Sequence, residues 1–127
     1  MTLKYRIIQR NNPRQPQAPK KFYASAVNKG QVKLRQLAEE IAQISTVSTV
    51  DTIAVIEALL QLIPQHLTQG EIVRLGDFGS YTVSIKSESA EQENEFTAQK
   101  IKGLKISFRP GSEFKRALND TQFEKER

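Results

Sequence analysis

The sequence Ile72-Val73-Arg74-Leu75-Gly76-Asp77-Phe78-Gly79-Ser80-Tyr81-Thr82-Val83 is followed, after a polar loop over residues 86–98, by Leu104-Lys105-Ile106-Ser107-Phe108-Arg109-Pro110-Gly111-Ser112-Glu113-Phe114. In both segments apolar side chains alternate with polar ones, a pattern typical of strands that bury one face. The apolar set is Tyr81, Val83, Ile85, Leu104, Ile106 and Phe108, and the polar set is Ser80, Thr82, Ser84, Lys105, Ser107 and Arg109. We therefore predict an antiparallel hairpin with an apolar face against helices and a small, hydroxylated, basic face opposite.

Glycine and proline mark the two ends of this predicted sheet. The run Gly76-Asp77-Phe78-Gly79 predicts a tight turn at the first corner, and Phe78 is expected to enter the core from it. Pro110-Gly111 ends the last strand, because proline cannot donate to a strand ladder. Ser112 can then cap a short helix that extends to about Asn119.

Two helices are predicted ahead of the sheet. Apolar residues recur at helical spacing from about Lys33 to Ile44, although Lys33 is a poor residue for capping a helix start. Ser48, with Asp51 three residues later, predicts the capped start of a second helix that stops at Gln69-Gly70. Pro64 should kink or thin this helix near its end. The second helix is apolar on more than one face, so either the sheet or a second copy of the chain must cover the remainder.

The two ends of the chain differ in their expected order. Residues 3–9 and 21–27 alternate as strands do, and the loop Asn11 to Pro19 between them is rich in Pro, Gln and Asn. These segments predict an N-terminal β-hairpin. Residues 120–127 are polar and are expected to form a frayed tail.

Charge is distributed unevenly along the chain. The net charge is +5, yet no acidic residue occurs before residue 36, where nine lysines and arginines lie. The acids gather instead in the arm, at Glu88, Glu91, Glu93 and Glu95, and near the C-terminus. A one-sided basic segment favours contact with a polyanion, and a solvated, solubilising segment is the alternative at this stage.

The composition also bears on the class of protein. The chain has 127 residues, enough for one domain with appendages, and no cysteine, which excludes disulfides, thiolate metal sites and a cysteine nucleophile. His66 is the only histidine, and no pairing of a nucleophile with a base is present. We expect a protein that is not an enzyme and that needs no cofactor or metal. The first residues lack the apolar run of a secretory signal, and the apolar stretch Ile53 to Ile63 is too short to span a bilayer.

The order of these elements resembles a known family. Helix, helix, glycine corner, strand, long arm, strand and short helix are the elements of the HU/IHF bacterial nucleoid proteins. The segments Val73 to Tyr81 and Phe108 to Lys115 resemble that family's Gly-x-Phe-Gly corner and the close of its sheet. The resemblance covers roughly Lys33 to Asn119. The basic hairpin before it resembles the extension of longer HU-like proteins of Bacteroidetes.

The resemblance implies an α+β fold with a helix pair, a three-stranded antiparallel sheet with an arm, and a short C-terminal helix, preceded by the hairpin. It divides the chain into a basic extension (residues 1–30), an HU-like domain (31–120) and a polar tail (121–127). It further implies an intertwined homodimer, with a heterodimer of related chains as the alternative, that binds double-stranded DNA. The expected location is the bacterial nucleoid, in the cytoplasm, with no membrane partner.

The arm departs from the family pattern. The family's arm is basic and ends in a proline that wedges between base steps. Here residues 86–98 contain four glutamates and no proline, and only Lys86 keeps a charge where the family leads into the arm with arginines. The proline wedge therefore does not carry over to this chain. Phe96 is expected to pack back on the sheet, the alternative being an apolar wedge.

Cations on or beside the polar sheet face, on the last helix and in the N-terminal extension are the candidate DNA contacts. They are Lys86, Lys102, Lys105, Arg109, Lys115, Arg116, Arg10, Arg14, Lys20 and Lys21. Phosphate neutralisation by such residues releases counterions, so binding should weaken steeply with salt and show little sequence preference. Tyr5 and Tyr23 are expected to pack within the hairpin, the alternative being stacking on bases.

A second class of function fits the same residues. The chain could be a structural homodimer that keeps the HU scaffold and binds protein partners through its acidic arm, with little affinity for DNA. Binding to DNA at low salt separates the two hypotheses.

Overall fold

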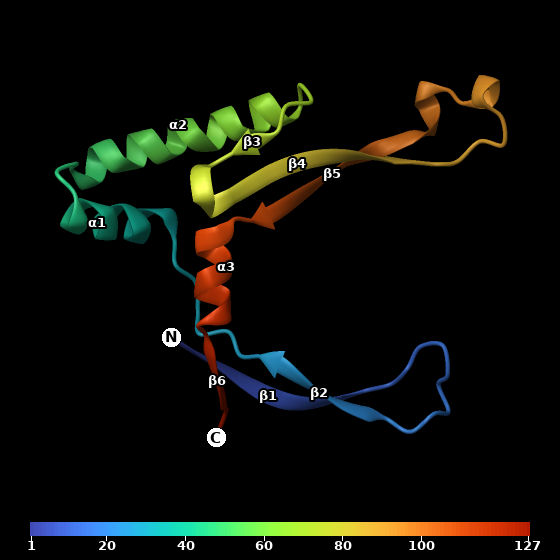
Figure 1. Ribbon diagram of the computed structural model, residues 1–127, viewed down its shortest axis with the longest axis horizontal. Helices are drawn as coiled ribbons and strands as arrows, with labels where there is room; N and C mark the ends of the chain where they lie inside the picture. Colours follow the sequence, from blue (N-terminus) through green and yellow to red (C-terminus); the bar gives the residue numbers. More distant parts are fainter. The chain divides into compact units, whose positions relative to one another are not determined.

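The structure, a computed structural model, describes all residues from 1 to 127 and divides into two compact units (Figure 1). One unit comprises Val32–Lys115, and the other comprises Met1–Gln31 together with Arg116–Arg127. The short helix α3 (Ser112–Asn119) crosses the boundary between them. None of the helices is both long and apolar enough to cross a membrane.

Two helices begin the larger unit. Helix α1 (Leu34–Ile44) starts after Lys33, whose side chain makes no capping hydrogen bond, as its chemistry predicts. Helix α2 (Thr49–Leu67) starts at Ser48, whose hydroxyl accepts a hydrogen bond from the Asp51 backbone N–H at 3.1 Å. This confirms the capped start predicted from Ser48 and Asp51. Pro64 lies inside α2, which ends one turn later, where Gly70 has a φ of +90°.

The sheet of this unit has the order β3-β4-β5. Its strands are β3 (Val73–Arg74), β4 (Gly79–Ser87) and β5 (Ile101–Pro110), and neighbours are antiparallel. Tyr81 pairs with Phe108, and Ser80 pairs with Arg109, so apolar residues face apolar and polar face polar. The alternation predicted from the sequence is therefore confirmed. Beyond the helices β4 and β5 continue as a ribbon to the arm (Figure 1), which contains the short 3-10 turns η2 (Glu93–Glu95) and η3 (Ala98–Lys100).

The corner before β4 is built by close backbone contacts that only glycine permits. A 3-10 turn, η1 (Gly76–Phe78), precedes Gly79, where an added Cβ would lie 2.6 Å from the Arg109 carbonyl oxygen. At Gly111 a Cβ would collide with the Asp77 carbonyl, and the Gly111 N–H donates to the Phe78 carbonyl at 2.8 Å. The corner at Gly76–Gly79 and the segment at Pro110–Gly111 therefore pack directly against each other.

An aromatic cluster lies beside this corner. Phe108 is its centre, with ring centroids 4.8 Å from Tyr81, 5.4 Å from Phe78 and 5.7 Å from Phe114. Phe78 and Phe114 are also in contact, with centroids 5.3 Å apart. Phe78 was expected to enter the core, and it does join this cluster, although 45% of it remains exposed in the single chain.

The smaller unit is a three-stranded sheet of order β2-β1-β6. Strand β1 (Thr2–Arg10) pairs antiparallel with β2 (Lys21–Ala26) and parallel with β6 (Gln122–Lys125). The expectation of a frayed tail is wrong over β6. The cause is backbone bonding to a strand at the other end of the chain: the Gln122 N–H donates to the Met1 carbonyl at 2.9 Å, and the Glu126 N–H donates to Tyr5 at 2.7 Å.

Large apolar surfaces of the larger unit stay uncovered in the single chain. The only buried apolar residues are Ala38 and Leu67. On α2, Val55 is 65% exposed and Leu60 is 51% exposed, so the sheet does not cover the remainder of this helix. On the apolar sheet face, Ile85 and Ile106 are each 61% exposed.

Candidate nucleic-acid interface

A shallow hollow lies on the polar face of the β3-β4-β5 sheet. Its volume is about 250 Å³, and its polar lining comes from Arg74, Ser80, Thr82, Ser107 and Arg109. All three strands contribute: alternation turns the small hydroxylated side chains of β4 and β5 to this face, and β3 adds Arg74 beside Ser80. Small side chains therefore line the centre of the hollow, and Arg74 and Arg109 lie at its sides.

Two arginines flank one serine in this hollow. Ser80 is the cross-strand neighbour of Arg74 on one side and of Arg109 on the other. Because neighbouring strands lie about 4.8 Å apart, the two arginine α-carbons are separated by roughly 10 Å. That spacing leaves room for one sugar-phosphate unit over the serine, with a guanidinium on each side.

Sequence reasoning missed Arg74 as a site residue. It lies in a strand of only two residues, too short to show an alternation, so the sequence did not indicate its face. The usable signal was its position two residues before the glycine corner, which sets the register of β3 against β4.

The cations of the hollow have no acidic partner. The ion pairs of the chain are Arg6–Glu126, Arg35–Glu39, His66–Glu71 and Lys102–Glu88. Arg74, Lys105 and Arg109 are in none of them. Lys105 pairs across the sheet with Ser84, and Arg109 with Ser80, so neither charge is offset by a strand neighbour. The face therefore presents uncompensated positive charge to solvent.

The remaining predicted residues of the β4–β5 hairpin lie at the base of the arm. Lys86 is on β4, opposite Gly103 and next to an irregularity in the strand register. Lys102 forms an ion pair with Glu88, with Nζ 3.1 Å from the carboxylate oxygen. Lys102 has no partner in the register, which steps from Gly103 to Ile101 at the irregularity, and it is not among the residues that line the hollow.

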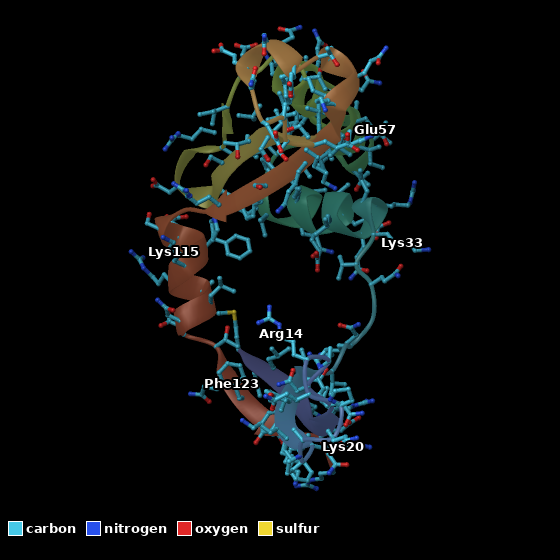
Figure 2. The ribbon with its side chains drawn as sticks, turned by 90° about the vertical axis from the view of Figure 1, so that its right-hand side faces the viewer. Arg14, Lys20, Lys33, Glu57, Lys115 and Phe123 are labelled. Atoms are coloured by element: carbon cyan, nitrogen blue, oxygen red, sulfur yellow. The ribbon has the colours of Figure 1, made fainter.

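The other predicted cations fall outside the hollow. Lys115 and Arg116 are on α3, at the boundary between the units. Arg10 and Lys21 are cross-strand neighbours at the end of the β1–β2 hairpin. Arg14 and Lys20 are on the loop that joins these strands, in the same unit as Phe123 (Figure 2). The predicted site residues thus form two groups, one in each compact unit.

Two residues weighed for other roles lie apart from the hollow. The Nδ1 atom of His66 is 2.9 Å from a carboxylate oxygen of Glu71, and both side chains are about half exposed. Phe96 follows η2 in the arm and is 41% exposed. No three His, Cys, Asp or Glu side chains are arranged to hold a metal ion.

Comparison with known proteins identifies the family. The model of the HU-HIG family, an HU domain fused to a wHTH, Ig or glycine-rich motif, matches residues 1–125. The chain therefore belongs to this family, and the HU resemblance predicted from the sequence is confirmed. The match extends over the N-terminal hairpin and β6, beyond the stretch from Lys33 to Asn119 on which the resemblance was based.

A solved structure shows the same fold. It is a crystal structure of a candidate bacterial DNA-binding protein from Bacteroides vulgatus ATCC 8482, with a TM-score of 0.70 and 16% sequence identity. The similarity covers 99% of this chain and 49% of that one, so this chain spans about half the length of that protein. Comparison with the curated proteins gives no match.

Proposed function

We propose that this protein is a dimeric, HU-like architectural protein that binds double-stranded DNA without sequence preference through the polar face of the β3-β4-β5 sheet. The observation that supports this most directly is the pair of unpartnered arginines, Arg74 and Arg109, on either side of Ser80. The proposed place of action is the bacterial nucleoid, in the cytoplasm. The proposal includes no catalytic step, cofactor or metal.

The chemistry of the hollow suits a phosphate backbone. Guanidinium groups bind phosphate oxygens in a bidentate geometry, and serine and threonine hydroxyls donate to the same oxygens. Because no base edge is addressed by this arrangement, affinity should depend on salt far more than on sequence. Lys105 extends the cationic row along β5 toward the arm.

The dimer is proposed from uncovered apolar surface. On α2, Val55 and Leu60 are more than half exposed, and on the sheet Ile85 and Ile106 are as well. Leaving such side chains in water forfeits about 1.5–3 kcal/mol each relative to full burial. A second copy that packs α2 against α2 would cover these residues and double the number of cationic hollows. A related chain could replace the second copy, since the same surfaces would be covered.

The acidic arm supports the second candidate function. Of its four glutamates only Glu88 has a cationic partner, and Glu91, Glu93 and Glu95 are free in or beside the short 3-10 turns. Negative charge there opposes entry into a DNA groove and favours a basic protein partner. The alternative function is therefore a scaffold dimer that binds protein through this arm and has little affinity for DNA.

A gel-shift titration of the full chain at low and high salt tests the proposal. We expect binding of a duplex at micromolar concentration or tighter, collapsing at high salt because bound phosphates release counterions. The double variant Lys105→Glu/Arg109→Glu should abolish this binding. The double variant Lys29→Glu/Lys33→Glu, which has the same charge change outside the strands, should keep most of it.

Two outcomes would contradict the proposal. An intact dimer that fails to bind duplex at low salt would favour the scaffold function. Unchanged affinity in the Lys105→Glu/Arg109→Glu variant would show that the sheet face is not the site.

A further inference from the structure

The β1–β2 hairpin places two like charges directly opposite each other. Arg10 and Lys21 are a cross-strand pair in its register, and neither has a carboxylate within ion-pair distance. Like charges at opposed positions of a sheet destabilise it. On the β4–β5 hairpin the cations Lys105 and Arg109 face serines instead, so no such repulsion arises there. An anion between Arg10 and Lys21 would turn this local repulsion into two favourable contacts.

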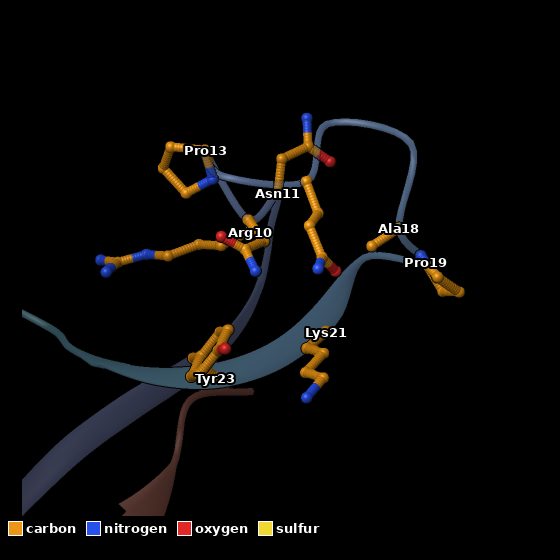
Figure 3. Close-up of a pocket in the computed structure, with 9 residues that line it drawn as sticks. Arg10, Asn11, Pro13, Ala18, Pro19, Lys21 and Tyr23 are labelled. Atoms are coloured by element: carbon orange, nitrogen blue, oxygen red, sulfur yellow. The ribbon is translucent and has the colours of Figure 1, made fainter.

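A pocket of about 620 Å³ lies at this end of the hairpin, beneath the loop. Its lining includes Arg10, Lys21, Tyr23, Asn12, Pro13 and Pro19. Figure 3 shows Tyr23 and Lys21 projecting from β2, with Arg10 extending from the end of β1 above Tyr23 in that view. The volume is within the range of pockets that hold small molecules, about 300–1,000 Å³.

An aromatic ring is presented beside the two cations. Tyr23 pairs with Ile8 across the hairpin and, two residues from Lys21, shares the face of Arg10 and Lys21. The side chain is not packed away, because 49% of Tyr23 is exposed. The expectation that Tyr23 packs within the hairpin therefore holds for only part of its surface. An exposed tyrosine beside cations is the arrangement on which nucleic-acid bases stack.

The loop above the pocket is held in one shape. The Arg14 N–H donates to Oδ1 of Asn12 at 3.0 Å, and the Gln15 and Ala18 N–H groups donate to the carbonyls of Asn12 and Gln15, each at 3.0 Å. Pro13, Pro16 and Pro19 fix their own φ angles. Such a preorganised rim loses little conformational entropy when a ligand binds.

We propose that this pocket binds one unpaired nucleotide of a nucleic-acid strand. The phosphate lies between Arg10 and Lys21, and the base stacks on Tyr23. A base inside a duplex cannot reach the ring, since both of its faces are stacked on neighbouring bases, so the ligand is a single strand or an unpaired position in a duplex. This inference rests on the proposed DNA-binding function and adds to it a second site, of different preference, in the other compact unit.

Fluorescence anisotropy with two labelled oligonucleotides tests the pocket. The probes are a single-stranded oligothymidylate about 12 nucleotides long and an abasic strand of the same length, which has the same phosphates and no bases. The full chain should bind the oligothymidylate about fivefold or more tighter, because stacking of one base on an aromatic ring contributes about 1–3 kcal/mol. The variant Tyr23→Leu should bind both strands equally and keep the salt dependence of the abasic strand.

Removal of the two cations should change the salt dependence of binding, which Tyr23→Leu should not. The variant Arg10→Gln/Lys21→Gln should bind both strands more weakly, with the slope of log affinity against log salt reduced by about 0.7 for the one phosphate that the two cations hold. The melting temperature of the free protein should rise, since the opposed charges are gone. The control Lys29→Gln/Lys33→Gln removes the same charge outside the pocket and should change the slope less.

The outcomes separate this site from the sheet face. Equal binding of the two probes by the wild-type chain, or an unchanged preference in Tyr23→Leu, would overturn the pocket while duplex binding through the sheet face stands. Retention of the oligothymidylate preference in Lys105→Glu/Arg109→Glu would support a separate site. A wild-type chain that fails to bind duplex at low salt but keeps the oligothymidylate preference would overturn the proposed function alone.

Discussion

The two hairpins of this chain divide positive charge in opposite ways. The β1–β2 hairpin has no acidic residue, and four of its six cations and all three of its prolines lie in or next to the loop. On the β4–β5 hairpin Lys105 and Arg109 lie on β5, away from the arm and outside every ion pair, and the arm contains four glutamates and no proline. The comparison teaches that length and shape of a ribbon do not decide which end can approach phosphate. The placement of charge decides this. It favours phosphate contact at the loop end of the β1–β2 hairpin and at the base of the β4–β5 hairpin.

The hairpins also differ in what holds them. The β4–β5 hairpin is anchored by the aromatic cluster around Phe108 and by the contacts of Gly79 and Gly111, yet its apolar face is uncovered. The β1–β2 hairpin is anchored by the parallel strand β6 and by the two bonds from Arg6 to the Glu126 carboxylate, at 3.0 and 3.2 Å. The first therefore leaves apolar side chains exposed in the single chain, and the second is held by the far end of its own chain.

Breaking the proposed dimer should have the largest effect. Leu60→Glu places a charge on the exposed apolar side of α2, where burial of an unpaired charge costs about 3 kcal/mol or more. We expect sedimentation equilibrium to show a monomer, and duplex affinity to fall by about 100-fold or more. Binding of the oligothymidylate should survive, since that site belongs to the other unit. Glu57→Gln on the same helix is the control, and a dimer of normal affinity in Leu60→Glu would refute the α2 interface.

The corner of the β4–β5 hairpin should be the next most sensitive. Gly111→Ala drives a methyl group into the Asp77 carbonyl, and overpacking of this kind costs about 2–3 kcal/mol. Urea unfolding should show the loss. Gly70→Ala is the matched control, since an added Cβ there meets nothing and only the φ of +90° is strained. Equal losses in the two variants would mean that the glycine contacts do not hold the corner.

Neutralising two glutamates of the arm should raise the affinity for duplex DNA. Glu91→Gln/Glu93→Gln removes two free carboxylates, and at about 0.3–0.5 kcal/mol for each exposed charge the duplex affinity should rise about three- to fivefold at low salt. The gain should vanish at high salt through screening. Glu40→Gln/Glu57→Gln, on the helices, is the control. A fall in duplex affinity would indicate that the arm supports DNA binding through something other than charge.

The ion pair of the smaller unit should matter least. Arg6→Gln removes the pair with Glu126, whose side chains are 56% and 37% exposed, so the cost should be no more than about 1 kcal/mol. Amide hydrogen exchange at Glu126, whose N–H bonds to Tyr5, should accelerate accordingly. Arg35→Gln, which removes an exposed pair within α1, is the control. A loss beyond about 2 kcal/mol would show that β6 depends on this pair rather than on its backbone bonds.

Local patterns predicted most of the larger unit. The start of α2 followed from Ser48 and Asp51, and the facing of Tyr81 with Phe108 and of Ser80 with Arg109 followed from alternation. Strand β6 could not be predicted, because Gln122–Lys125 shows no apolar pattern and its partner is β1. Arg74 was missed for a similar reason, since two residues are too few to define a face.

The sequence by itself determined the HU-like order of elements, the polar and apolar faces of the strands, and the separation of basic hairpin from acidic arm. These are local properties, set by side-chain period and by turn residues within a few positions of each other. Only the tertiary structure decided that Arg74 joins Arg109 across Ser80, that Arg10 opposes Lys21 beside Tyr23, and that the C-terminus completes the first sheet. Each of these is a pairing between strands, and register between strands depends on backbone hydrogen bonds and packing that no single segment encodes.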